Sequence, residues 1–393
     1  MGSDWREVRF EDVVELQAGF AFKSKDFLNE GKLRLARGAN ISQGSFNWSD
    51  TKYLPSDHRD IDDRYQLASG DVLLAMDRPW IPAGLKYAVV RPSDLPALLV
   101  QRVARLRARG DRLDQRFLYY LLGSPAFTDY VRSVETGTTI PHISGKQIMG
   151  YRVCIPPIEE QRAIAEVLGA LDDRIEWCAG AVGRLEALLL ELVRGEAAAV
   201  PVAELATYVN GGAYTKHAAG SGRLVIRIAE LSSGVGSSSS SKYADIDAPP
   251  ERTAYPGDIL FSWSATLDVY RWTADEAVVN QHIFKVLPAE QWQAWVVYAK
   301  LKEAMPTFQK IAHDRATTMG HIKRGHLKQV SVGLPDEAHL EQVRDLGDAL
   351  WDQHLRASRE QLHLANLRDT VLPRLLSGEV RIRDPERVLG AVA

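Results

Sequence analysis

The stretch that decides the fold reads IPPIEEQRAIAEVLGALDDRIEWCAGAVGRLEALLLEL, residues 155–192. After its two prolines, apolar residues recur alternately four and three positions apart along the whole stretch. This spacing is typical of a coiled-coil helix, which presents one apolar stripe to a partner helix. The predicted stripe, called the first seam, contains Ile164, Leu168, Leu171, Ile175, Cys178, Val182, Leu185, Leu189 and Leu192.

A weaker copy of this pattern lies near the other end of the sequence. Its predicted stripe, the second seam, contains Val343, Leu346, Leu350, Ala357, Leu364, Leu367 and Val371, with Gln353 and Glu360 as polar interruptions. Neither helix can bury its stripe alone, so we expect the two helices to pair with each other. The alternative is that each helix packs against its neighbouring domain only.

The sequence outside the helices is also written twice, with one copy before each helix. Five short motifs recur in the same order, with small insertions and deletions between them, which indicates an internal duplication. The matched pairs are Leu16–Lys23 with Val209–Lys216, Leu35–Ile41 with Val225–Leu231, Gly70–Leu74 with Gly257–Phe261, Val100–Val103 with Asn280–Ile283, and Thr138–Ile143 with Thr317–Ile322.

Each copy has the same internal plan. Short apolar runs broken by Gly, Pro, Asn and Asp predict strands and turns, and a helical stretch, a Thr-Thr loop and a strand ending in proline follow. We therefore predict an α+β protein of two tandem repeats, each an irregular α/β domain followed by a long helix. The predicted boundaries are 1–157 and 199–335 for the irregular domains, 158–198 for the first helix, and 336–382 for the second helix with its tail.

Composition sets broad limits on the class of protein. A length of 393 residues suits two or three domains, and two cysteines cannot form a disulfide framework, which favours a reducing cytoplasm. No apolar run is long enough to span a bilayer. The net charge of -3 does not exclude DNA binding, because binding depends on a local basic face.

Catalytic motifs are missing from the sequence. Gly31-Lys32 and Gly145-Lys146 are not followed by Ser or Thr, so there is no P-loop. Neither Pro-Pro pair belongs to the Asn/Asp-Pro-Pro-aromatic motif of an adenine methyltransferase, and the ten histidines show no metal-binding spacing. We expect a non-catalytic protein without a metal or cofactor of its own.

The plan resembles the specificity subunit of Type I restriction-modification systems over essentially the whole chain. The resemblance rests on Ile155–Ala165 (IPPIEEQRAIA), on the Gly-Asp pairs at Gly70 and Gly257, and on Leu375–Ile382 (LLSGEVRI). Proline followed by Glu-Gln at the start of a long helix is the most diagnostic of these motifs. The second copy departs from it, because residues 334–342 have one proline and a displaced Glu-Gln.

The resemblance implies a function and a set of partners. Each irregular domain would be a target-recognition domain that reads half of a bipartite double-stranded DNA target. The two helices would form an antiparallel coiled coil that spaces the halves. Two modification subunits, which bind S-adenosylmethionine and methylate adenine at N6, and two restriction subunits would assemble around the chain.

Candidate DNA contacts lie on loops that occur in both copies. Arg, Lys, Asn and His can reach base edges or phosphates, whereas the aromatic residues among the candidates fit a core equally well. The candidates are Phe22, Lys23, Arg37, Asn40, Arg78, Lys86, Thr138, Thr139, His142, Lys146, Tyr214, Lys216, Arg227, Trp263, Arg271, Thr317, Thr318, His321, Lys323 and Arg324.

Two other functions fit the sequence. The chain could be the specificity subunit of a related Type II system, or a duplicated adaptor that binds proteins and not DNA. Salt dependence separates the adaptor from the DNA readers, since phosphate contacts release counterions and weaken steeply with salt.

Overall fold

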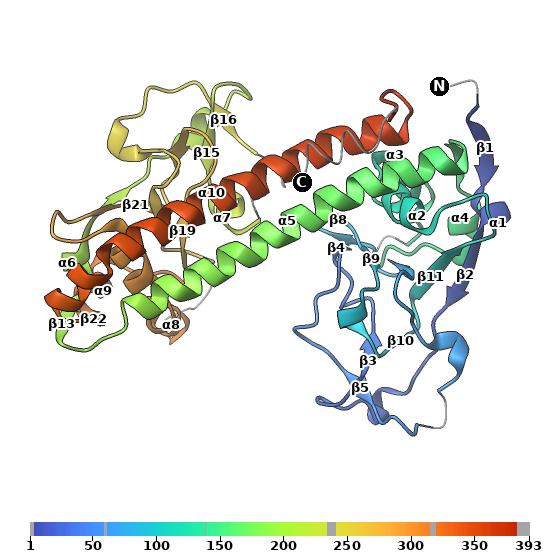
Figure 1. Ribbon diagram of the computed structural model, residues 1–393, viewed down its shortest axis with the longest axis horizontal. Coiled ribbons are helices and arrows are strands. Elements are labelled where there is room, and N and C mark those ends of the chain that lie inside the picture. Colours follow the sequence, from blue (N-terminus) through green and yellow to red (C-terminus); the bar gives the residue numbers. More distant parts are fainter. Residues whose placement is uncertain (1–3, 59–60, 138, 234–240, 315–319, 383–393) are drawn as a thin grey trace. The chain divides into compact units, whose positions relative to one another are not determined.

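The computed structural model describes residues 4–58, 61–137, 139–233, 241–314 and 320–382 (Figure 1). The chain divides into two compact units, of which the first combines Met1–Asp172 with Leu367–Ala393 and the second is Asp173–Asn366. Each unit mixes short strands with helices, which confirms the predicted combination of α and β structure. The domain boundaries proposed above stay a prediction, because the division into units cuts across both long helices.

The main sheet of the first unit has the strand order β2-β11-β6-β9-β4. Its central strand β6 is antiparallel to both neighbours, and all four of its residues are buried. A strand covered on both faces is expected to be a continuous apolar run, as Val-Leu-Leu-Ala is here. The strands are β2 (Val14–Ala18), β4 (Gln43–Gly44), β6 (Val72–Ala75), β9 (Tyr87–Val89) and β11 (Val103–Ala108).

Smaller elements surround this sheet. A second sheet has the order β10-β3-β5, strands β1 and β12 form an antiparallel pair, and β7 and β8 form a hairpin. Their bounds are β1 (Arg6–Arg9), β3 (Leu33–Ala36), β5 (Tyr53–Leu54), β7 (Trp80–Ile81), β8 (Gly84–Leu85), β10 (Ala97–Leu99) and β12 (Arg152–Ile155). The short helices are α1 (Phe10–Val13), α2 (Gln115–Leu122), α3 (Pro125–Val134) and α4 (Gly145–Met149).

The second unit has a main sheet of order β14-β21-β18-β19 and a smaller sheet of order β16-β15-β20-β17. Its strands are β13 (Ala198–Pro201), β14 (Ala206–Asn210), β15 (Arg223–Ile226), β16 (Tyr243–Ala244), β17 (Thr253–Ala254), β18 (Ile259–Ser262), β19 (Asp268–Arg271), β20 (Ala277–Val279), β21 (Ile283–Pro288) and β22 (Ser331–Leu334). Its helices are α6 (Val202–Leu205), α7 (Ile228–Ser233), α8 (Ala294–Asp314) and α9 (Arg324–Gln329).

The two units share strand order and register. Val72 of β6 pairs with Leu106 of β11, as Ile259 of β18 pairs with Val286 of β21. The pair β1–β12 likewise corresponds to β13–β22, and both pairs are antiparallel. This correspondence is compatible with the predicted duplication, and it assigns residues of β2, β11, β6 and β9 equivalents in β14, β21, β18 and β19.

Two long helices, α5 (Ile158–Leu192) and α10 (Glu337–Leu376), contribute to both units. In the second unit the Arg174 guanidinium lies 2.8 Å from the Glu360 carboxylate, and the His339 ring Nε2 lies 3.1 Å from the Leu192 carbonyl oxygen. Residue numbers therefore rise on one helix as they fall on the other, so the two helices run antiparallel there. Both helices are labelled in Figure 1, α5 in green and α10 in red.

The first seam follows its prediction closely. Ile164, Leu168, Leu171, Cys178 and Leu189 are buried. The other members, Ile175, Val182, Leu185 and Leu192, are half-buried.

The second seam is rotated relative to its prediction. Val343, Leu350, Leu364 and Val371 are buried or half-buried, but Leu367 is 38% exposed and Leu346 is 52% exposed. The covered stripe contains Leu340, Val343, Gly347, Leu350, His354, Ala357, Gln361, Leu364, Arg368, Val371 and Leu375.

Polar residues within this stripe explain the difference. Burial lowers the pKa of His354 to about 4, so its neutral ring stacks on Trp351 with 5.9 Å between ring centroids. Arg368 is ion-paired with Asp172 of α5 at 3.1 Å. A search for apolar spacing passes over such residues and selects the neighbouring, exposed leucines instead.

Two leucines of α10 test this assignment. We expect Leu364→Ala to lower the free energy of unfolding by about 2 kcal/mol, because it opens a cavity at a buried position. The matched change Leu367→Ala should cost less than about 0.5 kcal/mol, since that side chain is exposed. Urea denaturation of the full chain measures both, and equal losses would contradict the observed stripe.

Candidate nucleic-acid interface

Two loop regions that are far apart in the sequence meet at the end of β6. An isolated antiparallel bridge joins Asp77 to His142, and the Arg78 N–H donates to the Pro141 carbonyl at 2.8 Å. The Ile143 N–H donates to the Met76 carbonyl, also at 2.8 Å. We call residues 76–78 together with 141–143 the first junction.

The second unit has a junction of the same form at the end of β18. A bridge joins Ser264 to His321, and the Ala265 N–H donates to the Gly320 carbonyl at 3.0 Å. The Ile322 N–H donates to the Trp263 carbonyl at 3.0 Å. Residues 263–265 with 320–322 form the second junction, which therefore repeats the hydrogen-bond pattern of the first.

The backbone at both junctions is strained. Arg78 has φ of 45°, Arg102 has 68° and Ala265 has 56°, the three non-glycine residues with positive φ among those described. Arg102 is next to the first junction, since its carbonyl accepts from the Met76 N–H at 2.8 Å. Non-glycine residues in this region cost free energy and cluster at binding and catalytic sites.

Charges at the first junction are only partly paired. Asp77 accepts from the His142 ring and lies 2.6 Å from the Arg102 guanidinium. Lys86 is 8% exposed, and within the described ranges neither Lys86 nor Arg78 has a side-chain hydrogen bond or ion pair. Burial, followed by the nearby charge of Arg78, lowers the pKa of Lys86. Such a pair of cations is costly without an anion.

The second junction has a different charge pattern on the same backbone. Ala265 takes the place of Arg78, because both donate the same junction hydrogen bond. Asp268 takes the place of Lys86, because the strand pairs β6–β9 and β18–β19 align in the same register. Asp268 is ion-paired with Lys302 at 3.1 Å. The Trp263 indole is half-buried and lies 5.8 Å from Phe284 between ring centroids.

Several other candidates lie near the junctions in the sequence. Thr139 and Lys146 are exposed beside the first junction, and Lys323 and Arg324 are exposed beside the second. The Arg324 guanidinium donates to the Tyr208 carbonyl at 3.1 Å. Thr138, Thr317 and Thr318 lie outside the described residues.

Another group of candidates stabilises the fold locally. The Asn40 side chain is 1% exposed and donates to the Asn47 and Asp50 carbonyls at 3.2 Å. Arg37 is ion-paired with Asp50, and its counterpart Arg227 with Glu230. These contacts close turns, so they occupy the groups that would read a base.

The remaining candidates divide between the core and the surface. Phe22 is 3% exposed in an apolar cluster, and Tyr214 is half-buried against another. Arg271 lies over the Trp351 ring at 3.4 Å from its centroid, and burial lowers its pKa to about 10. Lys23 and Lys216 are exposed, each at a 3-10 turn.

The sequence analysis missed Asp77 and Arg102. Arg102 belongs to the repeated motif Val100–Val103, so the repeat itself was the signal that could have found it. Over the ranges that the structure describes, no group of three metal-ligating side chains occurs. Within the same ranges, no helix has the length and apolar character to cross a bilayer.

Comparison with known proteins finds relatives for the first part of the chain. Residues 2–181 match the Type I restriction modification DNA specificity domain. Over 173 residues the chain is 34% identical to the Type I restriction enzyme MjaVIII specificity subunit of Methanocaldococcus jannaschii, a match that covers 44% of this chain and 40% of that protein.

A second relative agrees with this match. The Type I restriction enzyme EcoAI specificity subunit of Escherichia coli is 37% identical over 177 residues, which are 44% of this chain and 29% of that protein. The matched segment thus spans less than half the length of either relative.

The fold also has a counterpart of known structure. The S subunit of a Type I restriction-modification system from M. genitalium matches with a TM-score of 0.57 and 14% identity, over 96% of this chain and 97% of that one. At this identity the likeness concerns the fold alone. Residues 2–181, a little under half of the chain, are thus similar to the DNA specificity domain of Type I restriction-modification systems.

Proposed function

We propose that this chain reads a bipartite DNA target and directs adenine-N6 methylation and restriction, both carried out by partner subunits. The observation that carries the proposal is the pair of Arg78, in the first junction, and Lys86, next to it. Within the part of the chain that the structure describes, neither cation has a protein counterion, and Arg78 is exposed on strained backbone. A DNA phosphate or the acceptor edge of a guanine supplies the missing anionic or acceptor group.

The recurrence of the junction supports a two-part target. Two loops with the same backbone hydrogen bonds suit two half-sites, as in other paired DNA readers. Their side chains differ, with Arg78 in one and Ala265 in the other, so the two halves of the target should differ in sequence. We assign to the α5–α10 pair, as an antiparallel coiled coil, the role of spacer between the halves.

The partners follow from the family. We propose two modification subunits, which bind S-adenosylmethionine and supply the methyl transfer, and two restriction subunits. This chain then contributes recognition and no catalytic residue. A Type II assembly with the same recognition chain differs in its nuclease and not in the role proposed here.

Methylome sequencing tests the proposed function. A host that expresses this chain with its neighbouring modification subunit should carry N6-methyladenine in both halves of a split motif. The motif should disappear when this chain alone is deleted. Unchanged methylation without the chain would contradict the proposal and favour the adaptor.

The salt dependence of binding tests the role of the two cations. The complex of this chain with its modification subunit is titrated onto a duplex carrying the motif, at several salt concentrations. Arg78→Gln and Lys86→Met should each weaken binding and reduce the slope of log K against log salt by about 1, since each removes about one phosphate contact.

Arg152→Gln is the matched control. Arg152 is an exposed arginine on β12 whose nearest carboxylate, Glu7, lies 3.7 Å away. It should leave the slope unchanged. A slope near zero in the unmodified complex would indicate an adaptor, and equal effects of all three changes would contradict a specific role for the first junction.

A further inference from the structure

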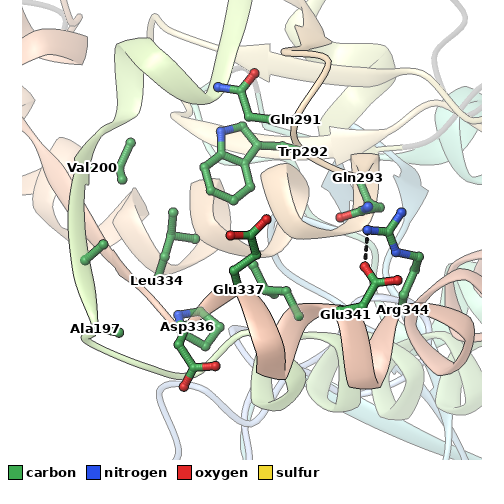
Figure 2. Close-up of a pocket in the computed structure, with 13 residues that line it drawn as sticks. Ala197, Val200, Gln291, Trp292, Gln293, Leu334, Asp336, Glu337, Glu341 and Arg344 are labelled. Carbon is green, nitrogen blue, oxygen red and sulfur yellow. Dashed lines mark hydrogen bonds and ion pairs between the residues drawn. The ribbon is translucent and has the colours of Figure 1, made fainter.

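The second unit contains a cavity of about 520 Å³ beside the start of α10 (Figure 2). Its walls come from the segment that leads into β13, the loop before α8, the end of β22 and the first turns of α10. Figure 2 shows Val200, Leu334 and Trp292 around one space, with the Glu337 carboxylate directed toward the Trp292 ring. This volume falls in the range of sites that hold a ligand or a side chain.

The equivalent place in the first unit is filled by Gln161. This side chain is fully buried and its amide donates to the Arg112 carbonyl at 2.9 Å and the Pro156 carbonyl at 2.8 Å. Its oxygen accepts from the Asp114 N–H at 2.9 Å. The amide thus ties the start of α5 to the loop before α2.

Leu340 is the counterpart of Gln161 on α10. The Gln161 N–H donates to the Pro157 carbonyl, and the Leu340 N–H donates to the Asp336 carbonyl, at the same position of each helix. A leucine forms none of the three side-chain hydrogen bonds. The loop before α8 is therefore left without this link, and the space between it and the helix stays open.

A second replacement enlarges the same space. The register of the β1–β12 and β13–β22 pairs makes Ala197 the counterpart of Trp5. In the first unit the Trp5 ring lies against Gly378, so closely that a Cβ there would approach it to 3.0 Å. In the second unit a methyl group replaces this indole. Around one cavity, an indole has thus been replaced by a methyl group and a hydrogen-bonding amide by a leucine.

The chemistry of the cavity selects its occupant. Its floor is apolar, with Leu334 and Leu340 buried, and Trp292 contributes an aromatic ring. Carboxylates surround the opening, and the one arginine there, Arg344, is ion-paired with Glu341. An aliphatic stem with a cationic head fits such a site, because the stem packs on the leucines and the head meets the ring and Glu337.

We propose that this cavity receives an arginine or lysine side chain of a modification subunit. The inference rests on the proposed function, which supplies that partner. In the first unit Gln161 and Trp5 stand at the equivalent positions, so the insertion is proposed for the second unit alone. The two modification subunits are therefore held unequally, and the one at the second unit depends on this insertion.

Two variants of the full chain test the proposal in complex with the modification subunit. Glu337→Lys reverses the charge at the opening, and Leu340→Gln introduces the hydrogen-bonding amide that the first unit has at the equivalent position. Native mass spectrometry over a concentration series counts the bound modification subunits. Each variant should weaken the binding of one of the two by at least about tenfold and leave the other unchanged.

Glu159→Lys is the control for charge reversal, because Glu159 is an exposed carboxylate in the first turn of α5. It should leave both affinities as they are. Two unaffected affinities in Glu337→Lys and Leu340→Gln would overturn the inference, as would a loss of both subunits together. An unmodified chain that binds no modification subunit would contradict the proposed function as well, so the two failures are distinguishable.

Discussion

Two long helices carry covered stripes that neither helix can bury alone, and the burial of these stripes positions the rest of each unit. Ile164 and Leu168 of α5 share one apolar core with Val72 and Leu74 of β6. Leu189 of α5 belongs in the same way to the core that contains β18. Each junction begins where its central strand ends, so the packing of the helix determines where the junction lies.

The junctions show how one backbone serves two chemistries. Hydrogen bonds between main-chain groups hold both junctions together, so the side chains of the junction residues can differ. Asp77, held by Arg102 and His142, leaves Arg78 and Lys86 uncompensated in the first unit. In the second unit Asp268 and Lys302 compensate each other. The two junctions thus share a backbone frame and differ in their charges.

Much of the fold could be predicted from the sequence, because helix spacing and repeated motifs are local signals. The first seam is apolar throughout, and its members are buried or half-buried. The covered stripe of the second helix is rotated from the predicted one, since it includes His354, whose ring stacks on Trp351, and Arg368, which is ion-paired with Asp172. Spacing rules recognise apolar side chains and cannot see such contacts.

Less of the candidate site could be predicted, because its contacts depend on tertiary structure. Arg37 and Arg227 sit on loops and resemble base readers, yet each is bound to a nearby carboxylate. Arg271 is covered by Trp351, a residue distant in sequence. The importance of Arg102 arises from strand register, which brings it beside Asp77. The residue type and its position on a loop do not show whether an arginine is available to DNA or already paired with a carboxylate of the protein.

The central claim is that each junction contacts one half of the target, and site-specific photo-crosslinking tests it most directly. A photoreactive phenylalanine analogue is placed at exposed Thr139 beside the first junction or at exposed Lys323 beside the second, in the complex with the modification subunit. The crosslinked nucleotides are then mapped on a duplex carrying the methylated motif. The account predicts crosslinks in opposite halves of the motif. Crosslinks in the same half, or none to DNA from either position, would contradict it.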